Sequence, residues 1–218
     1  MAGSDALILC DVGNSRMHFW EEGRILHLGH EEGLARYGRK RVYYICVHGA
    51  TKEAIARRAP AWVDLEPRRC LPTRYRGLGI DREAACLGIG KEGVVVDAGS
   101  AVTVDIVEDG VHRGGWIWPG LAALREAYAR ISPVLAIDPD PAWVRKGLPL
   151  STEAAVGFGV FAPVVETVRA YAPGKSLHLT GGDAPLFASL FDDAVVDEAL
   201  VFKGMMKMLK SKTKDTRC

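Results

Sequence analysis

Two loops of the same design, far apart along the chain, restrict the fold more than any other feature of the sequence. Residues 11–15 (DVGNS) and residues 97–100 (DAGS) each follow an apolar run, and each precedes a second extended segment. Self-similarity of this kind indicates a duplicated structure. We therefore expect two related halves, residues 1–92 and residues 93–218, with one such loop in each.

The segments around these loops alternate between extended and helical patterns. Extended patterns cover residues 6–10, 17–20, 41–47, 93–107, 111–117 and 177–179. Helical patterns cover residues 52–59, 81–87, 121–130 and 151–172. Glu108-Asp109-Gly110 predicts a hairpin turn, and residues 133–149 read as a proline-rich connection. Alternating strands and helices predict an α/β protein.

Charge and composition exclude several functions. The 218 residues include 28 Lys and Arg against 27 Asp and Glu, without the basic excess typical of nucleic-acid binders. The one basic run is residues 203–217; its last dozen residues read as a solvated end, and a nucleic-acid-binding arm there is the open alternative. The chain starts without a signal-peptide pattern, and no apolar run approaches the roughly 20 residues of a membrane span.

The cysteines point to a reducing compartment. They are scattered and odd in number, with no Cys-x-x-Cys pair, at Cys10, Cys46, Cys70, Cys86 and Cys218. Reduced thiols are the simplest interpretation. We therefore expect a soluble, cytoplasmic protein.

Each Asp-x-Gly loop carries the parts that phosphoryl transfer needs. A glycine turn lets backbone N–H groups approach phosphate oxygens, a Ser or Asn adds a donor, and an Asp at a strand end can hold Mg²⁺. A single Asp-x-Gly is usually only a turn, but two at matching positions favour phosphate loops. Residues 180–183 (TGGD) form a third glycine site, which fits either a nucleoside lying on the backbone or a simple strand-to-helix turn.

Asp81 is the candidate general base. A kinase that acts on an alcohol benefits from a carboxylate that accepts the hydroxyl proton. Asp81 stands beside Arg82 at a predicted helix start, so an N-cap role is the competing interpretation.

Six segments together resemble the type III pantothenate kinases, a family within the actin-like, sugar kinase and Hsp70 ATPase superfamily. They occur in family order over nearly the whole chain: DVGNS at Asp11, Tyr75 followed by GIDR at Gly79, VVVDAGSAVTVD at Val94, GGWIWPGL at Gly114, STEAAVGFG at Ser151 and TGGDA at Thr180. The resemblance implies duplicated actin-like (ribonuclease H-like) halves with a nucleotide cleft between them. It also implies a homodimer, with the substrate pocket formed partly at the dimer interface.

The resemblance implies a role for each site residue. ATP would be bound by Asp11, Val12, Gly13, Asn14, Ser15, Arg16, Met17, His18 and Ser100, with Asp11 near Mg²⁺. Asp97 would hold a monovalent cation, K⁺ or NH₄⁺. Asp81 would activate the primary hydroxyl of pantothenate, and the substrate would be held by Tyr75, Gly79, Ile80, Asp81, Arg82 and Thr152. The product would be 4′-phosphopantothenate, the first intermediate of coenzyme A biosynthesis.

The chain departs from the family pattern in two respects. Ser15 and Ser100 stand where the family usually has Thr, which keeps the hydroxyl donor but loses a methyl group that restricts the rotamer. The segment between Ser15 and Tyr75 is also short for the family.

Two other functions stay open at this point. Another kinase on the same scaffold could phosphorylate a sugar or a small acid, although the apolar run 116–118 (WIW) favours an elongated, partly apolar substrate. A regulatory relative could bind nucleotide or a partner protein without catalysis. The joint presence of Asp11, Asp81 and Asp97 weighs against that alternative.

Overall fold

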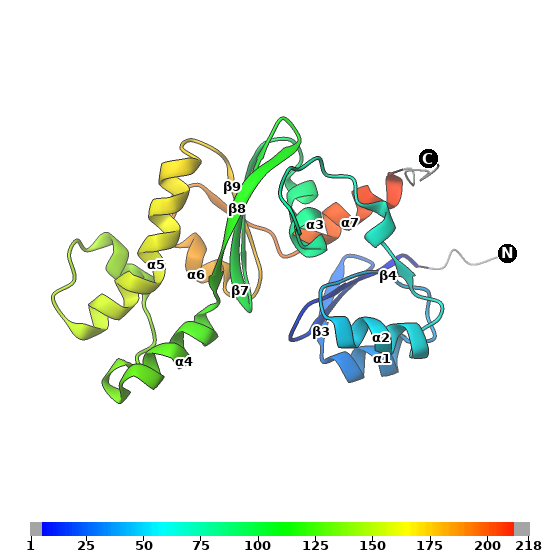
Figure 1. Cartoon of the computed structure of the whole chain (residues 1–218), viewed down its shortest axis with the longest axis horizontal. Coiled ribbons are helices and arrows are strands. Elements are labelled where there is room, and N and C mark those ends of the chain that lie inside the picture. Colours follow the sequence, from blue (N-terminus) through cyan, green and yellow to red (C-terminus); the bar gives the residue numbers. More distant parts are fainter. Residues whose placement is uncertain (1–5, 212–218) are drawn as a thin grey trace. The chain divides into compact units, whose positions relative to one another are not determined.

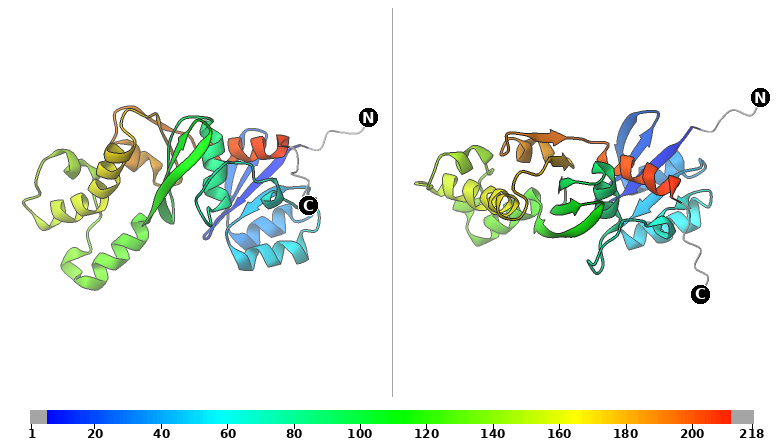
Figure 2. Two further views of the ribbon diagram at one scale, coloured as in Figure 1. Left: turned by 45° about the horizontal axis from the view of Figure 1, so that its top comes forward. Right: turned by 90° about the horizontal axis from the view of Figure 1, so that it is seen from above.

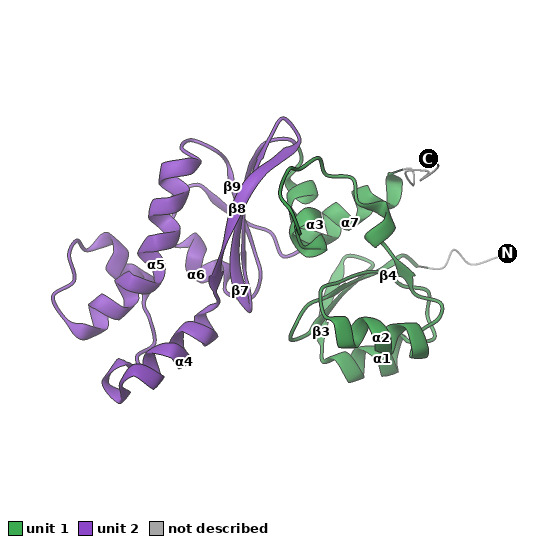
Figure 3. Cartoon of the chain, in the orientation of Figure 1, with its two compact units in different colours: residues 1–90, 199–218 green, residues 91–198 purple. Residues whose placement is uncertain are grey.

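The computed structural model describes residues 6–211, and these divide into two compact units (Figure 3). Unit 1 holds the described residues 6–90 and 199–211, and unit 2 holds residues 91–198. These units do not coincide with the halves 1–92 and 93–218 expected from the sequence. The difference arises because the last helix, α7 (Leu200–Lys210), packs on α3 (Ile80–Ile89) of unit 1.

Unit 1 contains a five-stranded sheet in the order β3-β2-β1-β4-β5. Strand β1 pairs antiparallel with β2 and parallel with β4. The strands are β1 (Ile8–Val12), β2 (Met17–Glu21), β3 (Arg24–Leu28), β4 (Tyr43–Cys46) and β5 (Val63–Asp64). The other helical elements are α1 (His30–Tyr37), α2 (Gly49–Arg58) and the 3₁₀ turn η1 (Glu66–Arg68).

Helices cover both faces of this sheet (Figure 1). Alternate residues of β1 point to opposite faces, and Ile8, Cys10 and Val12 join one core with residues of α1 and α2. On the other face α7 contacts β1 and α3 contacts β4. Figures 1 and 2 show α3 and α7 side by side. The helix that carries Asp81 therefore packs on this second face.

Unit 2 contains a second five-stranded sheet in the order β10-β9-β6-β7-β8. Its strands are β6 (Gly93–Ala98), β7 (Ala101–Glu108), β8 (Val111–Pro119), β9 (Leu177–Thr180) and β10 (Ala194–Val196). Its helical elements are α4 (Leu121–Ile131), η2 (Pro133–Leu135), η3 (Pro141–Arg145), α5 (Thr152–Tyr171) and α6 (Ala184–Ala188). Apolar side chains of α5 and α6 pack on β6 and β7 to form the core.

The two sheets have the same topology. Read from β8, the second order is β8-β7-β6-β9-β10, which matches β3-β2-β1-β4-β5 strand for strand. The antiparallel pair β6–β7 and the parallel pair β6–β9 repeat the pairs that β1 makes. The predicted α/β class and duplication are therefore confirmed.

Most local predictions agree with the structure. Ser151 caps α5 by accepting a hydrogen bond from the Ala154 N–H at 3.1 Å. The predicted hairpin turn joins β7 to β8, with Glu108 paired to Val111. No helix in the described range 6–211 is long and apolar enough to cross a membrane.

The structure corrects the prediction for the basic run 203–217. The last dozen residues are expected to be solvated, but α7 continues through the first of them to Lys210 and buries Met208. Val201, Met205 and Met208 are buried on one face, whereas Lys203, Lys207 and Lys210 are exposed. The predicted arm beyond residue 211, including Cys218, lies outside the described residues.

Candidate functional site

The loop after β1 is held through its backbone. The Gly13 N–H donates to the Arg16 carbonyl oxygen at 3.0 Å, and the Val47 N–H donates to the Val12 carbonyl oxygen at 3.1 Å. Backbone contacts thus set the path of the loop, while three of its polar side chains are exposed: Asn14, Ser15 and Arg16. The structure therefore leaves these polar groups accessible to a ligand such as a phosphate.

Histidines support the same loop. The His30 Nε2 lies 3.0 Å from the Gly13 carbonyl oxygen, so this nitrogen carries the proton and donates it. At the end of the loop, the Nδ1 atoms of His18 and His27 are 2.6 Å apart. Burial, together with the neighbouring His27 and Arg16, lowers the pKa of His18 from 6.5 to about 4. His18 is therefore neutral at pH 7.

The Asp11 side chain lies on the sheet face covered by α3 and α7. Its neighbours Cys10 and Val12 point into the core on the other face, so the alternation of β1 directs Asp11 away from them. The residue is half-buried, and its Oδ1 atom is inaccessible to solvent. A carboxylate oxygen at a strand end is the donor type that Mg²⁺ prefers, so Asp11 fits that ion.

Asp97 occupies the equivalent position in unit 2. It is half-buried near the end of β6, and its strand partner on β7 is Thr103. Directly opposed residues of an antiparallel pair have side chains on the same face. The Thr103 Oγ1 atom is buried and has no hydrogen-bond partner among residues 6–211. Asp97 and Thr103 thus offer neighbouring oxygen atoms, which fit a hard cation.

Gly181 brings a third loop against Asp97. Its backbone has φ +91, and a Cβ atom there would collide with the Ala98 carbonyl carbon and the Asp97 Oδ1, each 2.6 Å away. Only glycine accommodates both this backbone conformation and this approach. The Asp183 N–H then donates to the Ala98 carbonyl oxygen at 2.9 Å. Residues 180–183 therefore form a strand-to-helix turn that also closes over the Asp97 loop.

Asp81 lies in the first turn of α3. The N-cap residue of this helix is Gly79, in an extended conformation, so the alternative of Asp81 as N-cap is wrong. The Asp81 Oδ1 accepts a hydrogen bond from the Arg82 N–H at 2.8 Å. The positive end of the helix dipole favours a charged carboxylate at this place.

Arg82 and Tyr75 come together beside Asp81. The Arg82 side chain is buried, and its guanidinium carbon lies 4.9 Å from the centre of the Tyr75 ring. Its Nη1 also donates to the Tyr75 hydroxyl oxygen at 3.3 Å. The structure thus brings together two of the predicted substrate-binding residues.

A cavity of about 370 Å³ lies in unit 1 beside these residues. Eight of its nine lining residues come from the segment 69–78, Tyr75 among them, and the ninth is Glu83. This volume is in the range of small-molecule sites. Asp81 is not among the lining residues, although it is only two positions before Glu83.

Several predicted residues lie outside this cavity. Ser100 and Thr152 are exposed and belong to unit 2. Trp116 and Trp118 pack against the hydrophobic core of unit 2 and do not line the cavity. The apolar run 116–118 therefore no longer favours an apolar substrate.

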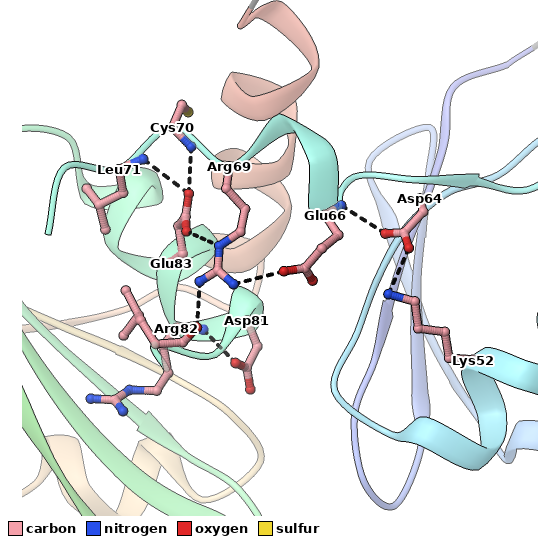
Figure 4. A network of polar contacts seen from close by, with 10 residues as sticks. Lys52, Asp64, Glu66, Arg69, Cys70, Leu71, Asp81, Arg82 and Glu83 are labelled. Atoms are coloured by element: carbon pink, nitrogen blue, oxygen red, sulfur yellow. Dashed lines mark hydrogen bonds and ion pairs between the residues drawn. The ribbon is translucent and has the colours of Figure 1, made fainter. Parts of the chain in front are cut away.

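Sequence reasoning missed Glu83 and Arg69. Glu83 is only 2% exposed, and its Oε2 accepts a hydrogen bond from the Arg69 Nε at 2.7 Å (Figure 4). A signal was present, because Glu83 stands among apolar residues of a helix whose next three residues are buried. A glutamate at such a position needs a buried partner. The sequence did not indicate which residue that partner is.

Comparison with known proteins gives a consistent assignment. The family profile of the type III pantothenate kinases matches residues 48–173. A protein of Helicobacter hepaticus named type III pantothenate kinase is 41% identical over 207 residues, covering 94% of this chain and 98% of the relative. A crystal structure from Campylobacter jejuni, described as a transcriptional activator of the Baf family, superposes with a TM-score of 0.82 at 38% identity. It covers 94% of this chain and 98% of its own.

A more distant structure supports the fold alone. The ethanolamine utilization protein EutJ from Carboxydothermus hydrogenoformans gives a TM-score of 0.52 at 14% identity, over 92% of this chain and 89% of its own. Together with the duplicated sheets, the structural neighbours identify the fold as actin-like. The profile match and the sequence identity over nearly the full length show that the chain belongs to the type III pantothenate kinase family.

Proposed function

We propose that this chain transfers the γ-phosphoryl group of ATP to the primary hydroxyl of pantothenate, which yields 4′-phosphopantothenate, the first intermediate of coenzyme A biosynthesis. The observation that carries the proposal is family membership over nearly the whole chain. The small-molecule cavity beside the first turn of α3 supports it.

In this proposal Asp81 is the general base and accepts the proton of the attacking hydroxyl. Its place in the first turn of α3 supports this role, because the backbone fixes the carboxylate without burying it completely. Tyr75, Gly79, Ile80 and Arg82 hold the substrate. The contact between Tyr75 and Arg82 orients both groups before the substrate binds.

ATP is bound by residues 11–18 and by Ser100. The backbone contacts that hold the first loop, and the exposed side chains of Asn14 and Ser15, support this assignment. Ser100 is exposed on the equivalent loop of unit 2. Both serines keep the hydroxyl donor, so we expect that replacing the usual Thr changes the affinity for ATP rather than the chemistry.

Two cations complete the proposal. Asp11 would hold Mg²⁺, directly or through water, and Asp97 would hold K⁺ or NH₄⁺ with Thr103 as a further oxygen donor. The buried Asp11 Oδ1 and Thr103 Oγ1 support these assignments. Such cations neutralise the charge of the phosphates during transfer.

We also propose a homodimer in the cytoplasm. Unit 2 exposes large apolar side chains, with Leu150 97% and Leu148 85% accessible, and burial against a second copy would remove them from water. Thr152 is exposed next to them, and we propose that it contributes to the pocket of the partner subunit. Sedimentation equilibrium tests the dimer, because a monomeric mass at assay concentrations contradicts it.

A coupled assay tests the activity directly. Purified protein with ATP, Mg²⁺ and K⁺ should release ADP only when pantothenate is present, and mass spectrometry should find 4′-phosphopantothenate. An absence of product under these conditions contradicts the proposal.

The same assay separates the alternatives. A panel of sugars and small acids in place of pantothenate tests for another kinase on this scaffold. The name of the Campylobacter jejuni structure keeps a regulatory function as the second candidate. A chain that binds ATP but phosphorylates no compound in the panel would favour regulation.

A further inference from the structure

The buried carboxylate of Glu83 lies at the centre of a polar network in unit 1 (Figure 4). Its Oε1 accepts hydrogen bonds from the backbone N–H groups of Cys70 and Leu71, at 2.7 and 3.1 Å. Its Oε2 accepts from the Arg69 Nε at 2.7 Å. A buried carboxylate is costly unless its oxygens are satisfied, and here three donors serve them.

Arg69 connects this carboxylate to the far end of the same loop. Its Nη2 donates to the Leu78 carbonyl oxygen at 2.5 Å, while its Nη1 donates to the Glu66 carboxylate at 2.9 Å. The rigid guanidinium fork spreads its donors over three nitrogens and so reaches three separately placed acceptors, whereas a lysine has all its donors on one nitrogen. Glu66 lies on the outer side of this fork, where its side chain is 40% exposed.

Together the two side chains fasten both ends of the segment 70–78 to α3. Glu83 holds the start of the segment through two backbone N–H groups, and Arg69 holds its end through the Leu78 carbonyl oxygen. The segment between these anchors lines most of the cavity and carries Tyr75. Tyr75 in turn contacts Arg82, which directly precedes Glu83 on α3.

We propose that Glu83 and Arg69 are positioning residues for the pantothenate pocket. They hold the cavity-lining segment against the helix that carries Asp81 and Arg82, so that Tyr75 faces Arg82 before the substrate arrives. Neither residue needs to touch the reacting atoms. The proposal rests on the proposed function for the identity of the substrate. The hydrogen bonds by which Glu83 and Arg69 hold the segment 70–78, here called the clamp, are a property of unit 1 alone.

Two variants weaken the clamp in different ways. In Glu83→Gln, the amide oxygen can still accept from Cys70 and Leu71, but the amide NH₂ then faces the Arg69 Nε, and two donors do not bond. Arg69→Lys keeps the charge but loses the fork. Glu66→Gln is the matched control, because it removes an ion pair from the same guanidinium without touching the loop backbone or Glu83.

Steady-state kinetics gives the first readout. For Glu83→Gln and Arg69→Lys we expect the KM for pantothenate to rise about tenfold or more while the KM for ATP changes less than about twofold. Glu66→Gln should leave both constants unchanged. A purely structural role would instead lower the amount of folded enzyme, which reduces the maximal rate and leaves both KM values as they were.

The reactivity of the Cys70 thiol gives a second readout that does not depend on activity. Cys70 is half-buried at the anchored start of the segment. Both variants break hydrogen bonds of Arg69, the residue beside Cys70, so the segment should open more often, and iodoacetamide should alkylate Cys70 about tenfold faster, since reactivity depends on exposure as well as on the thiolate pKa. Peptide mass spectrometry follows Cys70 separately from the other cysteines, and the buried Cys86 on α3 reports global unfolding.

The two measurements test the clamp separately from the proposed kinase activity. Faster alkylation of Cys70 in both variants, with Cys86 and the Glu66→Gln control unchanged, supports the clamp even if the wild type phosphorylates no pantothenate. An unchanged Cys70 rate overturns it, and so does an unchanged pantothenate KM in an active enzyme. If Glu83→Gln does not fold, Arg69→Lys decides by the same two measurements.

Discussion

The contact between α3 and α7 makes Gly204 the position where one methyl group should matter most. A Cβ atom at Gly204 would lie 2.5 Å from the carbonyl carbon of Ala84 and 2.9 Å from its Cα, whereas ordinary contacts of a Cβ fall between 3.4 and 4 Å. The obstacle is helix backbone, which cannot rotate out of the way as a side chain can. Gly204→Ala should therefore force α7 away from α3 by about 1 Å.

The structure sets the size of the effect. Overpacking a close-packed interior costs about 1–3 kcal/mol, and a collision with backbone belongs at the upper end of that range. Alanine is favoured over glycine inside a helix by about 1 kcal/mol, which opposes the loss. We expect a net decrease of about 2 kcal/mol in the free energy of unfolding of unit 1.

Urea denaturation followed by circular dichroism at 222 nm measures this decrease. Gly49→Ala is the matched control: Gly49 is also helical, at the start of α2, and a Cβ there meets nothing within 4 Å. The control should be neutral or stabilising by up to about 1 kcal/mol. If Gly204→Ala is as stable as the control, the close approach of the two helices does not restrict the side chain at this position.

Three further predictions concern the site. Asp81→Asn should lower kcat by about 100-fold or more with an unchanged unfolding curve, and retained activity would exclude Asp81 as the base. Replacing K⁺ by Na⁺ should depress the wild-type rate, and Asp97→Asn should raise the K⁺ concentration needed for half-maximal activity; an unchanged K⁺ titration would remove Asp97 from the cation site. Because the pKa of His18 is lowered from 6.5 to about 4 in the folded state, the unfolded chain binds the proton first, and stability should fall as the pH drops from about 6.5 towards 4. His18→Gln should lose less stability over that interval, as measured by urea denaturation at each pH, and an equal loss would show that His18 is not responsible.

Local sequence patterns were sufficient to predict the duplicated fold. The strands before Asp11 and Asp97, the turns after them and the cap at Ser151 all depend on residues close in the chain. Alternation along a strand also places each aspartate on the face opposite the core. These features need no knowledge of distant contacts.

The assignment of the last helix could not be predicted in the same way. Residues 203–217 carry a high density of lysine and arginine, which conceals the apolar face of α7. That face is stable only because α3, more than 100 residues earlier in the chain, offers small residues for close packing. Local sequence patterns do not predict a contact between segments so far apart in the chain.

The candidate site likewise contains residues that the sequence predicted and residues that only the folded structure shows. Asp81, Arg82 and Tyr75 follow from a recognisable motif, and the structure brings Arg82 and Tyr75 together. The clamp formed by Glu83 and Arg69 depends instead on a loop that returns to its own helix. Glu83 and Arg69 are separated by an irregular segment whose path no local pattern specifies.

The two copies of the repeat differ in how the loop after the first strand is closed. In unit 1 the pairing of β1 with β4 continues to Val12 and Cys46, and the Val47 N–H then bonds to the Val12 carbonyl oxygen. In unit 2 the pairing of β6 with β9 ends at Asp97 and Thr180. Gly181 then takes the place that Cys46 has in unit 1.

Because Gly181 has no side chain, the chain turns sharply at this point, and the next loop closes against the Asp97 carboxylate. The loop of unit 1 instead leaves three polar side chains exposed and is supported from outside by His30. We propose that the carboxylate of Asp97, closed over by Gly181, serves the monovalent cation, and that the exposed polar groups of the unit 1 loop serve the phosphates of ATP. Glycine at position 181, where unit 1 has Cys46, permits this close approach to the Asp97 loop.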